Sequence, residues 1–320
     1  MTDSFAPVLI PTLCRYDHFK NCIESLKKCS GVENTEVYIG LDYPASPKHW
    51  DGYNKISEYL ETLKEQHPFK KLHVIKRERN YGVGVNGNFD HLRDEVFKTH
   101  DRIIVSEDDN IFSPAFLDYI NKGLEKYKDD KSVIGICGYR HYYDILKSDN
   151  NIYRQNVDFS AWGYGMWKDR YEELISKDYK WYQKQLTPKK VWNVARRNGK
   201  NRALQFVGAA LIKNKKYRIS DNLISVYMAL TGKDVIMPCV TCVKNNGIDG
   251  SGENFADTNI SLQKKHMSQP LFKEQVFTIS GDPYNYYKEN NIIHVKESYG
   301  KINTFKLVKG IIKIMIKSLK

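Results

Sequence analysis

The amino-acid sequence predicts an α/β protein in which a mostly parallel sheet is flanked by helices. Three observations support this prediction. Short runs of β-branched and other apolar residues alternate with longer segments of helical period through residues 1–140. The helical segments are long enough to form the right-handed crossovers that connect parallel strands. Polar residues follow the apolar runs directly, as they do where parallel strands end at a ligand-binding edge.

The expected elements follow one another in order. We expect strands over residues 6–13, 36–41, 72–75, 103–105 and 133–137, and helices over residues 17–28, 49–66, 86–99 and 114–127. In the second of these helices, five apolar or aromatic residues recur at spacings of three and four and therefore share one face: Tyr53, Ile56, Tyr59, Leu60 and Leu63. Farther along we expect a basic helical stretch over 167–216, a helix over 218–230 and a strand over 235–237.

Composition and charge narrow the classes of partner. The chain has 320 residues, enough for one large domain or two smaller ones. Its formal net charge of +12 favours anionic partners: a nucleotide, nucleic acid or an anionic lipid surface. The 22 Tyr and 13 Phe are scattered over the whole chain, which fits an ordinary core better than a stacking surface for bases. We therefore expect no nucleic-acid partner.

The N-terminus and the cysteines indicate a compartment. The first residues lack a basic region followed by an apolar stretch, so we expect no signal peptide, and no run of about 18 apolar residues predicts a membrane span. The 6 cysteines have no framework spacing, which favours a reduced, cytoplasmic interior. Cys239 and Cys242 could form half of a zinc site or a redox pair, but without a second pair we favour two ordinary strand residues.

The stretch over residues 102–110 is the centre of the functional prediction. A short β-branched run ends in three consecutive carboxylates, Glu107, Asp108 and Asp109. Burying them unpaired would cost several kcal/mol each, so they should leave the apolar layer for a cleft. Hard divalent cations take oxygen ligands and accept substrate phosphates in their open positions. The stretch therefore predicts a metal-diphosphate site, with a solvated acidic turn before the next helix as the alternative.

Other strand ends carry polar residues that should reach the same edge. Arg15 and Asp17 follow the first strand, and Asp42 follows the second. The third strand is followed by a segment over 77–88 that contains Asn80 and Gly82. Glycines there would let backbone N–H groups approach a phosphate or ribose, and the next helix would point its positive end at the same place. A flexible turn explains this segment equally well.

These motifs resemble the nucleotide-binding half of GT-A glycosyltransferases, a Rossmann-like α/β fold. Residues 105–109, Val-Ser-Glu-Asp-Asp, followed by residues 112–119, Phe-Ser-Pro-Ala-Phe-Leu-Asp-Tyr, are similar to the acidic motif and the helix after it in the N-acetylglucosaminyltransferase I family. The glycine-containing loop at Asn80 instead resembles bacterial surface-polysaccharide glycosyltransferases. The resemblance covers roughly residues 5–255 and extends to an aromatic segment with Trp162 and Gly163, which would face the acceptor.

The resemblance implies a role for each matching residue. Asp109 would bind Mn2+ or Mg2+, which bridges the two phosphates of a nucleotide sugar, with a UDP-sugar as the leading donor. Glu107 and Asp108 would bind hydroxyls of the sugar and the ribose. The remaining donor-binding residues would be Pro11, Thr12, Arg15, Asp17, Asp42, Asn80 and Gly82.

An inverting transfer needs a carboxylate that removes the proton of the acceptor hydroxyl. By resemblance Asp221, which opens the helix over 218–230, is the leading candidate, although the local sequence favours a helix cap at Ser220 or Asp221. Asp158 and Asp249 are the rivals. The polar, glycine-bearing stretch over 243–254, with Asn246 and Asp249, could be a lid over the donor or a merely disordered connector.

The C-terminal segment over 301–320 predicts an amphipathic helix. One face of this helix would carry lysines and the others apolar residues, a pattern typical of an interfacial membrane helix and also possible for a packed terminal helix. The lysines are Lys306, Lys309, Lys313, Lys317 and Lys320. We therefore divide the chain into a catalytic domain over 1–255, with a nucleotide-sugar half (1–140) and an acceptor half (141–255), a peripheral element over 256–300, and a membrane-associating helix over 301–320.

The whole pattern predicts an inverting, metal-dependent glycosyltransferase. It would work in the cytoplasm, peripherally at the inner face of the cell membrane, and extend a glycan acceptor such as a lipid-linked surface-polysaccharide intermediate. A sugar nucleotidyltransferase is a weaker alternative, because residues 11–15 lack the glycine-rich loop expected after its first strand. A non-catalytic basic protein that binds membranes or nucleic acid is a third.

Overall fold

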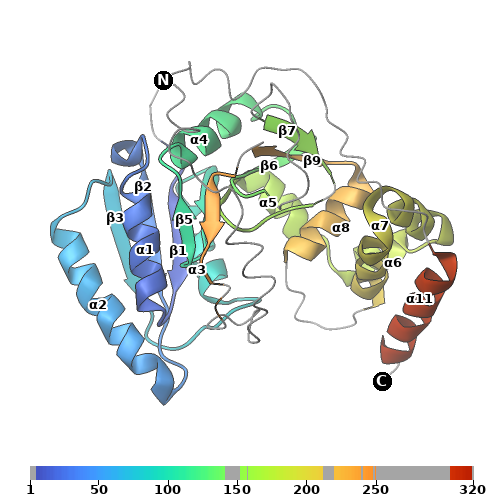
Figure 1. The fold of residues 1–320 in the computed structure, drawn as a ribbon, viewed down its shortest axis with the longest axis horizontal. Helices are drawn as coiled ribbons and strands as arrows, with labels where there is room; N and C mark the ends of the chain where they lie inside the picture. Colours follow the sequence, from blue (N-terminus) through green and yellow to red (C-terminus); the bar gives the residue numbers. More distant parts are fainter. Residues whose placement is uncertain are drawn as a thin grey trace.

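The computed structural model describes residues 5–140, 152–156, 158–211, 220–238, 241–247, 249 and 303–318. Its main feature is an 8-stranded sheet with the order β3-β2-β1-β4-β8-β6-β9-β7 (Figure 1). The strands are β1 (Val8–Thr12), β2 (Glu36–Leu41), β3 (Lys71–Lys76), β4 (Arg102–Val105), β5 (Asn110–Phe112), β6 (Val133–Cys137), β7 (Ile152–Gln155), β8 (Tyr164–Trp167), β9 (Asp234–Pro238) and β10 (Val243–Asn245). The α-helices are α1 (Tyr16–Leu26), α2 (Trp50–Glu65), α3 (Asn88–Val96), α4 (Phe116–Lys126), α5 (Lys168–Ile175), α6 (Tyr179–Gln185), α7 (Pro188–Leu211), α8 (Asp221–Thr231) and α11 (Thr304–Ser318).

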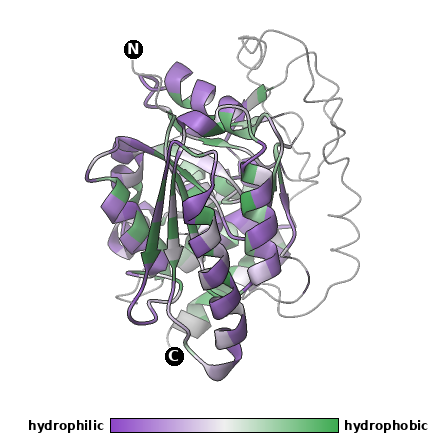
Figure 2. Ribbon diagram, turned by 90° about the vertical axis from the view of Figure 1, so that its left-hand side faces the viewer, coloured by the Kyte–Doolittle hydropathy of each residue, from purple (hydrophilic) through white to green (hydrophobic). Residues whose placement is uncertain are grey.

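The N-terminal half of the sheet is parallel, as predicted. Strand β1 pairs in parallel with β2 and β4, and β2 pairs in parallel with β3. Successive side chains of a strand point to opposite faces, and β1 shows this directly. Val8 and Ile10 pack in the core that includes α1, α2 and α4, whereas Leu9 packs in the core that includes α3, α5 and α8. Burial on both faces explains the near-continuous apolar runs of these strands, and Figure 2 shows hydrophobic strands between helices with hydrophilic outer faces.

The second half of the sheet departs from the simple alternation. Strand β8 lies between β4 and β6 and is antiparallel to both, and β7 is antiparallel to β9. These strands were not predicted, because β8 has only 4 residues and includes Gly165. A Cβ atom at Gly165 would lie 2.5 Å from Ile120 of α4, so the glycine lets this helix pack closely on the strand. The fold is therefore mixed, with helices on both faces and a mostly parallel first half.

Helices cover the second half and extend beyond it. Helices α6, α7, α8 and α11 share a separate core that includes Phe206, Val226 and Leu307. The described part of the predicted helical stretch over 167–216 contains α5, α6 and α7 after the last residue of β8, and residues 212–216 lie outside the described residues. Helix α7 is interrupted at Gly199, whose φ is 84°. The predicted C-terminal helix is also present as α11. The element predicted over 256–300 and the cysteine Cys239 lie outside the described residues.

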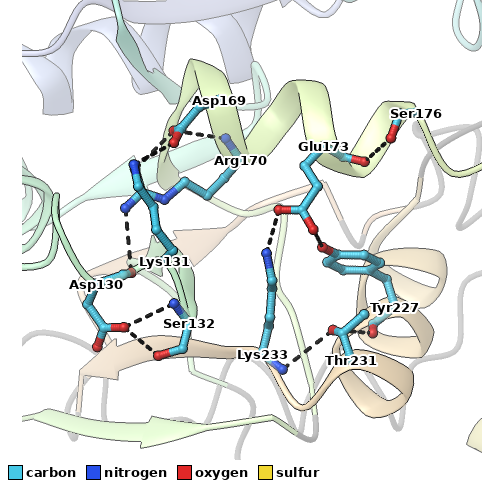
Figure 3. A network of polar contacts seen from close by, with 10 residues as sticks. All are labelled: Asp130, Lys131, Ser132, Asp169, Arg170, Glu173, Ser176, Tyr227, Thr231 and Lys233. Atoms are coloured by element: carbon cyan, nitrogen blue, oxygen red, sulfur yellow. Dashed lines mark hydrogen bonds and ion pairs between the residues drawn. The ribbon is translucent and has the colours of Figure 1, made fainter.

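Charged side chains form a network near the amino ends of β6 and β9 (Figure 3). Glu173 of α5 accepts a hydrogen bond from the Tyr227 hydroxyl at 2.6 Å and pairs with Lys233. Lys131 pairs with Asp169 at 2.7 Å. The network links α5 to α8 and to the turn before β6, at the edge of the sheet opposite to the carboxylate triplet.

Candidate functional site

The carboxyl ends of β1, β2 and β4 bring the predicted polar residues to one edge of the sheet. Thr12 ends β1, Asp42 follows β2, and the triplet follows β4. Since these strands are parallel neighbours, their ends must meet. The structure confirms this placement, which was the central geometric prediction.

Three elements surround Asp108 and Asp109, and both side chains are buried. The Thr12 hydroxyl donates a hydrogen bond to Asp108 Oδ2 at 2.9 Å. The guanidinium of Arg15, in the turn between β1 and α1, pairs with Asp108 Oδ1 and reaches Asp109 Oδ2 at 2.8 Å. The Asn245 side chain donates to Asp109 Oδ1 at 2.7 Å. The two carboxylates are thus held by side chains of β1, of the turn after it and of β10.

The charges at this edge are only partly neutralised. Desolvation, followed by the charges of Asp109, Asp221 and Asp108, raises the pKa of Glu107 to about 8. Desolvation also raises the pKa of Asp109, although the nearby Arg15 guanidinium acts in the opposite direction. A cluster of carboxylates that repel one another favours the binding of an additional cation.

The stretch after β9 returns to the triplet through β10. Strand β10 pairs antiparallel with β5, the strand that follows the triplet, so Asn245 lies opposite Asn110. A Cβ atom at Gly247 would lie 2.0 Å from Asp109 Oδ2, so only glycine allows the backbone to come this close. The Asn246 N–H also donates to the Asp109 carbonyl at 2.9 Å. The described beginning of this stretch, residues 243–247, therefore contacts Asp109.

Asp249, one of the rival bases, lies beyond this contact. Its carboxylate contacts Nε2 of His18, on the first helix, at 2.9 Å. The pair joins the stretch after β10 to α1, on the same side as Arg15. Most of the following glycine-rich stretch lies outside the described residues, so the proposed closure of a lid stays a prediction.

Asp42 has a different local role. Its Oδ1 accepts hydrogen bonds from the backbone of Tyr43 and Tyr81, each at 2.9 Å, and its Oδ2 accepts one from the backbone of Gly82 at 2.7 Å. The Asn80 side chain donates to the same Oδ2 at 3.3 Å. Asp42 thus fixes the shape of the loop after β3, and the predicted donor-binding residues Asn80 and Gly82 are held in place by it.

Asp221 lies at the start of α8, within reach of the charge of Glu107. Ser220, whose side chain accepts from the Leu223 N–H, caps α8, so Asp221 is the first helical residue and not the cap. The Ala161 N–H donates to Asp221 Oδ2 at 3.2 Å. Asp221 is also close enough for its charge to raise the pKa of Glu107. The structure therefore brings the leading base candidate and the acidic triplet together.

The other acceptor-side residues have mainly structural contacts. Trp162 is partly buried against Tyr139, with the ring centroids 4.5 Å apart. Gly163 has a φ of 69°, and a Cβ atom there would lie 2.8 Å from Val243. The Asp158 carboxylate pairs with Arg202 of α7. This ion pair makes Asp158 a weaker base candidate than Asp221.

Two further predicted donor residues, Pro11 and Asp17, have no contact that the structure records either with the triplet or with the loop held by Asp42. Pro11 lies within β1 and is partly exposed, one residue before Thr12. Asp17 is exposed in the first turn of α1, and its charge acts on Lys55 of α2. The contributions of Asn245, His18 and the Ala161 backbone were not predicted, because they depend on pairings between residues far apart in the sequence. The polar character of the stretch over 243–254 was the one available signal for Asn245.

The donor set suits a hard divalent cation, because Asp108 and Asp109 offer carboxylate oxygens. Among the side chains within the described ranges, no group of three or more His, Cys, Asp and Glu could hold a metal ion by itself. The remaining ligands of a metal at this edge would be water molecules or oxygens of the substrate. Arg15 lies between the two carboxylates, so metal binding also requires this side chain to move away.

Comparisons with known proteins give weak likenesses. No protein-family model and no curated protein matches the chain. Among solved structures, S. aureus TarS has a TM-score of 0.31 and 15% identity, covering 46% of this chain and 24% of TarS. S. aureus TarS 1-349 in complex with UDP-GlcNAc has a TM-score of 0.32 and 14% identity, covering 50% and 44%.

A third structure matches over nearly the whole chain. The mannosyltransferase PcManGT from Pyrobaculum calidifontis, in complex with GDP-Man and Mn2+, has a TM-score of 0.42 and 11% identity, covering 98% of this chain and 86% of that one. By contrast, the chain spans less than half the length of the two TarS structures given above. At these TM-scores and identities the likeness assigns neither a family nor an activity, so function must be argued from the residues themselves.

Proposed function

We propose that this protein is a metal-dependent glycosyltransferase of the GT-A type that uses a nucleotide sugar. One observation supports this most strongly. In the triplet at the carboxyl end of β4, Asp109 is contacted by Arg15 and Asn245, and Glu107 lies within reach of the charge of Asp221. A partly neutralised acidic cluster at a parallel sheet edge suits a metal-diphosphate group, and a separate carboxylate beside it suits a proton acceptor.

The donor would lie across the ends of β1, β2 and β4. Asp109 would bind the metal, and Glu107 and Asp108 would accept hydrogen bonds from hydroxyls of the sugar and ribose. Bound Mn2+ or Mg2+ would offset the charge that grows on the departing diphosphate. The loop fixed by Asp42 would border the nucleotide, and a UDP-sugar is the first donor to test.

The transfer would be inverting, with Asp221 as the general base. The acceptor hydroxyl oxygen would form a bond to the anomeric carbon as the bond from that carbon to the phosphate oxygen breaks. The hydroxyl proton would pass to Asp221, and nucleoside diphosphate would leave. The Ala161 N–H and the N-terminus of α8 would hold Asp221 in its ionised, proton-accepting form.

The acceptor would be a glycan, in particular a lipid-linked intermediate of a surface polysaccharide. The enzyme would reach it in the cytoplasm, peripherally at the inner face of the cell membrane. The net charge of +12 and the partly buried Trp162 support an anionic surface and a sugar-stacking acceptor side, respectively.

A panel of nucleotide sugars tests this function. Calorimetry with each donor in Mn2+, in Mg2+ and in a chelator should show binding that needs the metal. Incubation with the bound donor and glycan acceptors should release free nucleoside diphosphate. Release of pyrophosphate would instead identify a sugar nucleotidyltransferase, and binding of no nucleotide sugar under any condition would remove the proposal.

A further inference from the structure

The C-terminal helix α11 has three distinct faces. At 100° per residue, Leu307, Gly310, Ile311 and Ile314 lie on one side, and Lys306, Lys309 and Lys313 lie on a second. The third side carries the exposed apolar residues Phe305, Val308, Ile312, Met315 and Ile316. The sequence pattern alone left a packed helix and a membrane helix as alternatives, but a helix with three faces can be both.

The first face attaches α11 to the protein. Leu307 is only 3% exposed and belongs to the core shared by α6, α7 and α8, with Ile311 and Ile314 packed against it. A Cβ atom at Gly310 would lie 2.8 Å from the Leu204 side chain of α7, so the two helices approach closely there. The Asn303 side chain also caps the first turn by accepting from the Lys306 N–H at 2.9 Å. Helix α11 is therefore fixed to α7.

The second apolar face is left open to solvent. Phe305 is 76% exposed, and Ile316 and Ile312 are 54% and 51% exposed. Side chains of this size are rarely exposed in a continuous stripe on a soluble surface unless something binds there. A helix that only packed on α7 would need apolar residues on one side alone.

The charges on α11 favour one class of partner. Residues 304–318 contain four lysines and no acidic residue. Lys309 and Lys313 lie beside the exposed apolar stripe, and both are exposed. An apolar stripe bordered by lysines is complementary to a bilayer surface that presents anionic headgroups above acyl chains. No helix within the described ranges is long and apolar enough to cross a membrane.

We propose that the exposed face of α11 docks this protein on an anionic lipid bilayer. This builds on the proposed peripheral localisation and assigns it to named residues. Phe305, Ile312 and Ile316 enter the headgroup region, and Lys309 and Lys313 contact the lipid charges. In Figure 1, α11 lies beside α7 at the end of the molecule away from β1, β2 and β3.

Vesicle binding by the full chain tests the proposal. The protein should cosediment with vesicles of equal parts phosphatidylcholine and phosphatidylglycerol, and much less with phosphatidylcholine alone. The double variant Ile312→Asp/Ile316→Asp should bind the anionic vesicles at least about 100-fold more weakly, because two exposed side chains no longer enter the bilayer. Lys309→Ser/Lys313→Ser should weaken binding by about 10-fold or more.

Ile175→Asp is the matched control, because Ile175 is also an exposed isoleucine, 46% exposed, but lies on α5. It should bind vesicles like the unmodified protein.

All variants should keep the same unfolding temperature and donor binding, so a failure of docking is separable from a failure of the proposed activity. Equal vesicle binding by the α11 double variant and the unmodified protein would overturn the proposal. So would a dimer in size-exclusion chromatography that the double variant converts to a monomer, because the face would then bind a second copy.

Discussion

Carboxylates at the two edges of the sheet have opposite electrostatic environments. At the carboxyl edge, desolvation raises the pKa of Glu107 to about 8 and raises that of Asp109, and Arg15 is the cation that pairs directly with Asp108 and Asp109. At the amino edge, desolvation also acts on Asp169, but hydrogen bonds from Lys131 and Arg170 outweigh it and lower the pKa. Repulsion between carboxylates therefore dominates at the carboxyl edge, and pairing with cationic side chains dominates at the amino edge.

This difference separates function from stability. The amino-edge carboxylates have partners within the protein that match their charge, so they contribute to folding and need no ligand. The carboxyl-edge triplet is short of positive charge although Asp108 and Asp109 are buried and Glu107 is partly buried, an arrangement that costs stability unless a ligand supplies the missing cation. Asp42 shows that position alone is not enough, because it lies at the carboxyl edge yet is satisfied by backbone N–H groups.

The largest expected effect is that of Asp109→Asn. The amide keeps an oxygen for the Asn245 hydrogen bond but loses the charge that binds metal, so metal-dependent donor binding should be lost and activity should fall by more than about 100-fold. Calorimetry with donor and Mn2+ measures this. Asp169→Asn, which removes an amino-edge carboxylate, is the control and should bind donor normally. Equal donor binding by Asp109→Asn and the unmodified protein would contradict the metal assignment.

Asp221→Asn should affect turnover alone. The amide can still accept from the Ala161 N–H but cannot take a proton, so kcat should fall by about 10²- to 10⁴-fold while donor affinity stays the same. Steady-state kinetics and donor titration together give both values. Asp158→Asn is the comparison variant, because the Asp158 carboxylate pairs with Arg202 and is therefore the weaker base candidate. Normal turnover by Asp221→Asn would move the base to Asp158 or Asp249.

Arg15→Gln should change the affinity for metal in the absence of nucleotide. Arg15 is the built-in cation between Asp108 and Asp109, so its removal should tighten Mn2+ binding by about 10-fold, which corresponds to about 1.4 kcal/mol. Electron paramagnetic resonance measures the concentration of free Mn2+ at each point of the titration. Lys20→Gln removes the same charge from an exposed position on α1 and should leave the affinity unchanged. If both variants bind Mn2+ like the unmodified protein, Arg15 does not compete with metal.

The parallel half of the fold could be predicted because its signals are local. In β1, buried residues on both faces give a continuous apolar run, and in α2 the spacing of Ile56, Leu60 and Leu63 marks one buried face. Strand β8 could not be predicted in the same way. Its pairing depends on β4 and β6, and its Gly165 is required by close packing with Ile120.

The same distinction applies to the candidate site. Asp221 was identified by resemblance alone, since its local sequence favours a helix cap, whereas the triplet stands out in the sequence because three consecutive carboxylates end an apolar run. Asn245 and the Ala161 N–H do not, because their positions follow from the pairing of β10 with β5 and from the packing of α8. The role of Asp42 in holding the loop at Gly82 also depends on backbone atoms that no residue pattern shows.

The smallest expected effect lies at the amino edge and depends on pH. Desolvation raises the pKa of Glu173, but hydrogen bonds from Lys233 and Tyr227 outweigh it, so the net shift is downward. A carboxylate whose pKa is lowered in the folded protein stabilises the folded state at pH values above the unfolded-state pKa. This stabilisation is lost as the pH falls through the folded-state pKa.

Because the Glu173 side chain is 40% exposed, solvent screening limits the stabilisation that its charge contributes. Glu173→Gln should therefore cost about 1 kcal/mol or less at pH 7, a fall in Tm of at most about 2–4 °C, and less at pH 3, where more of the carboxylate is protonated. Thermal unfolding at both pH values measures this, with donor binding as a second readout that should not change. An equal loss of Tm at pH 3 and pH 7 would show that Glu173 acts through packing rather than charge, and a loss of donor binding would mean that the two edges are not separate in function.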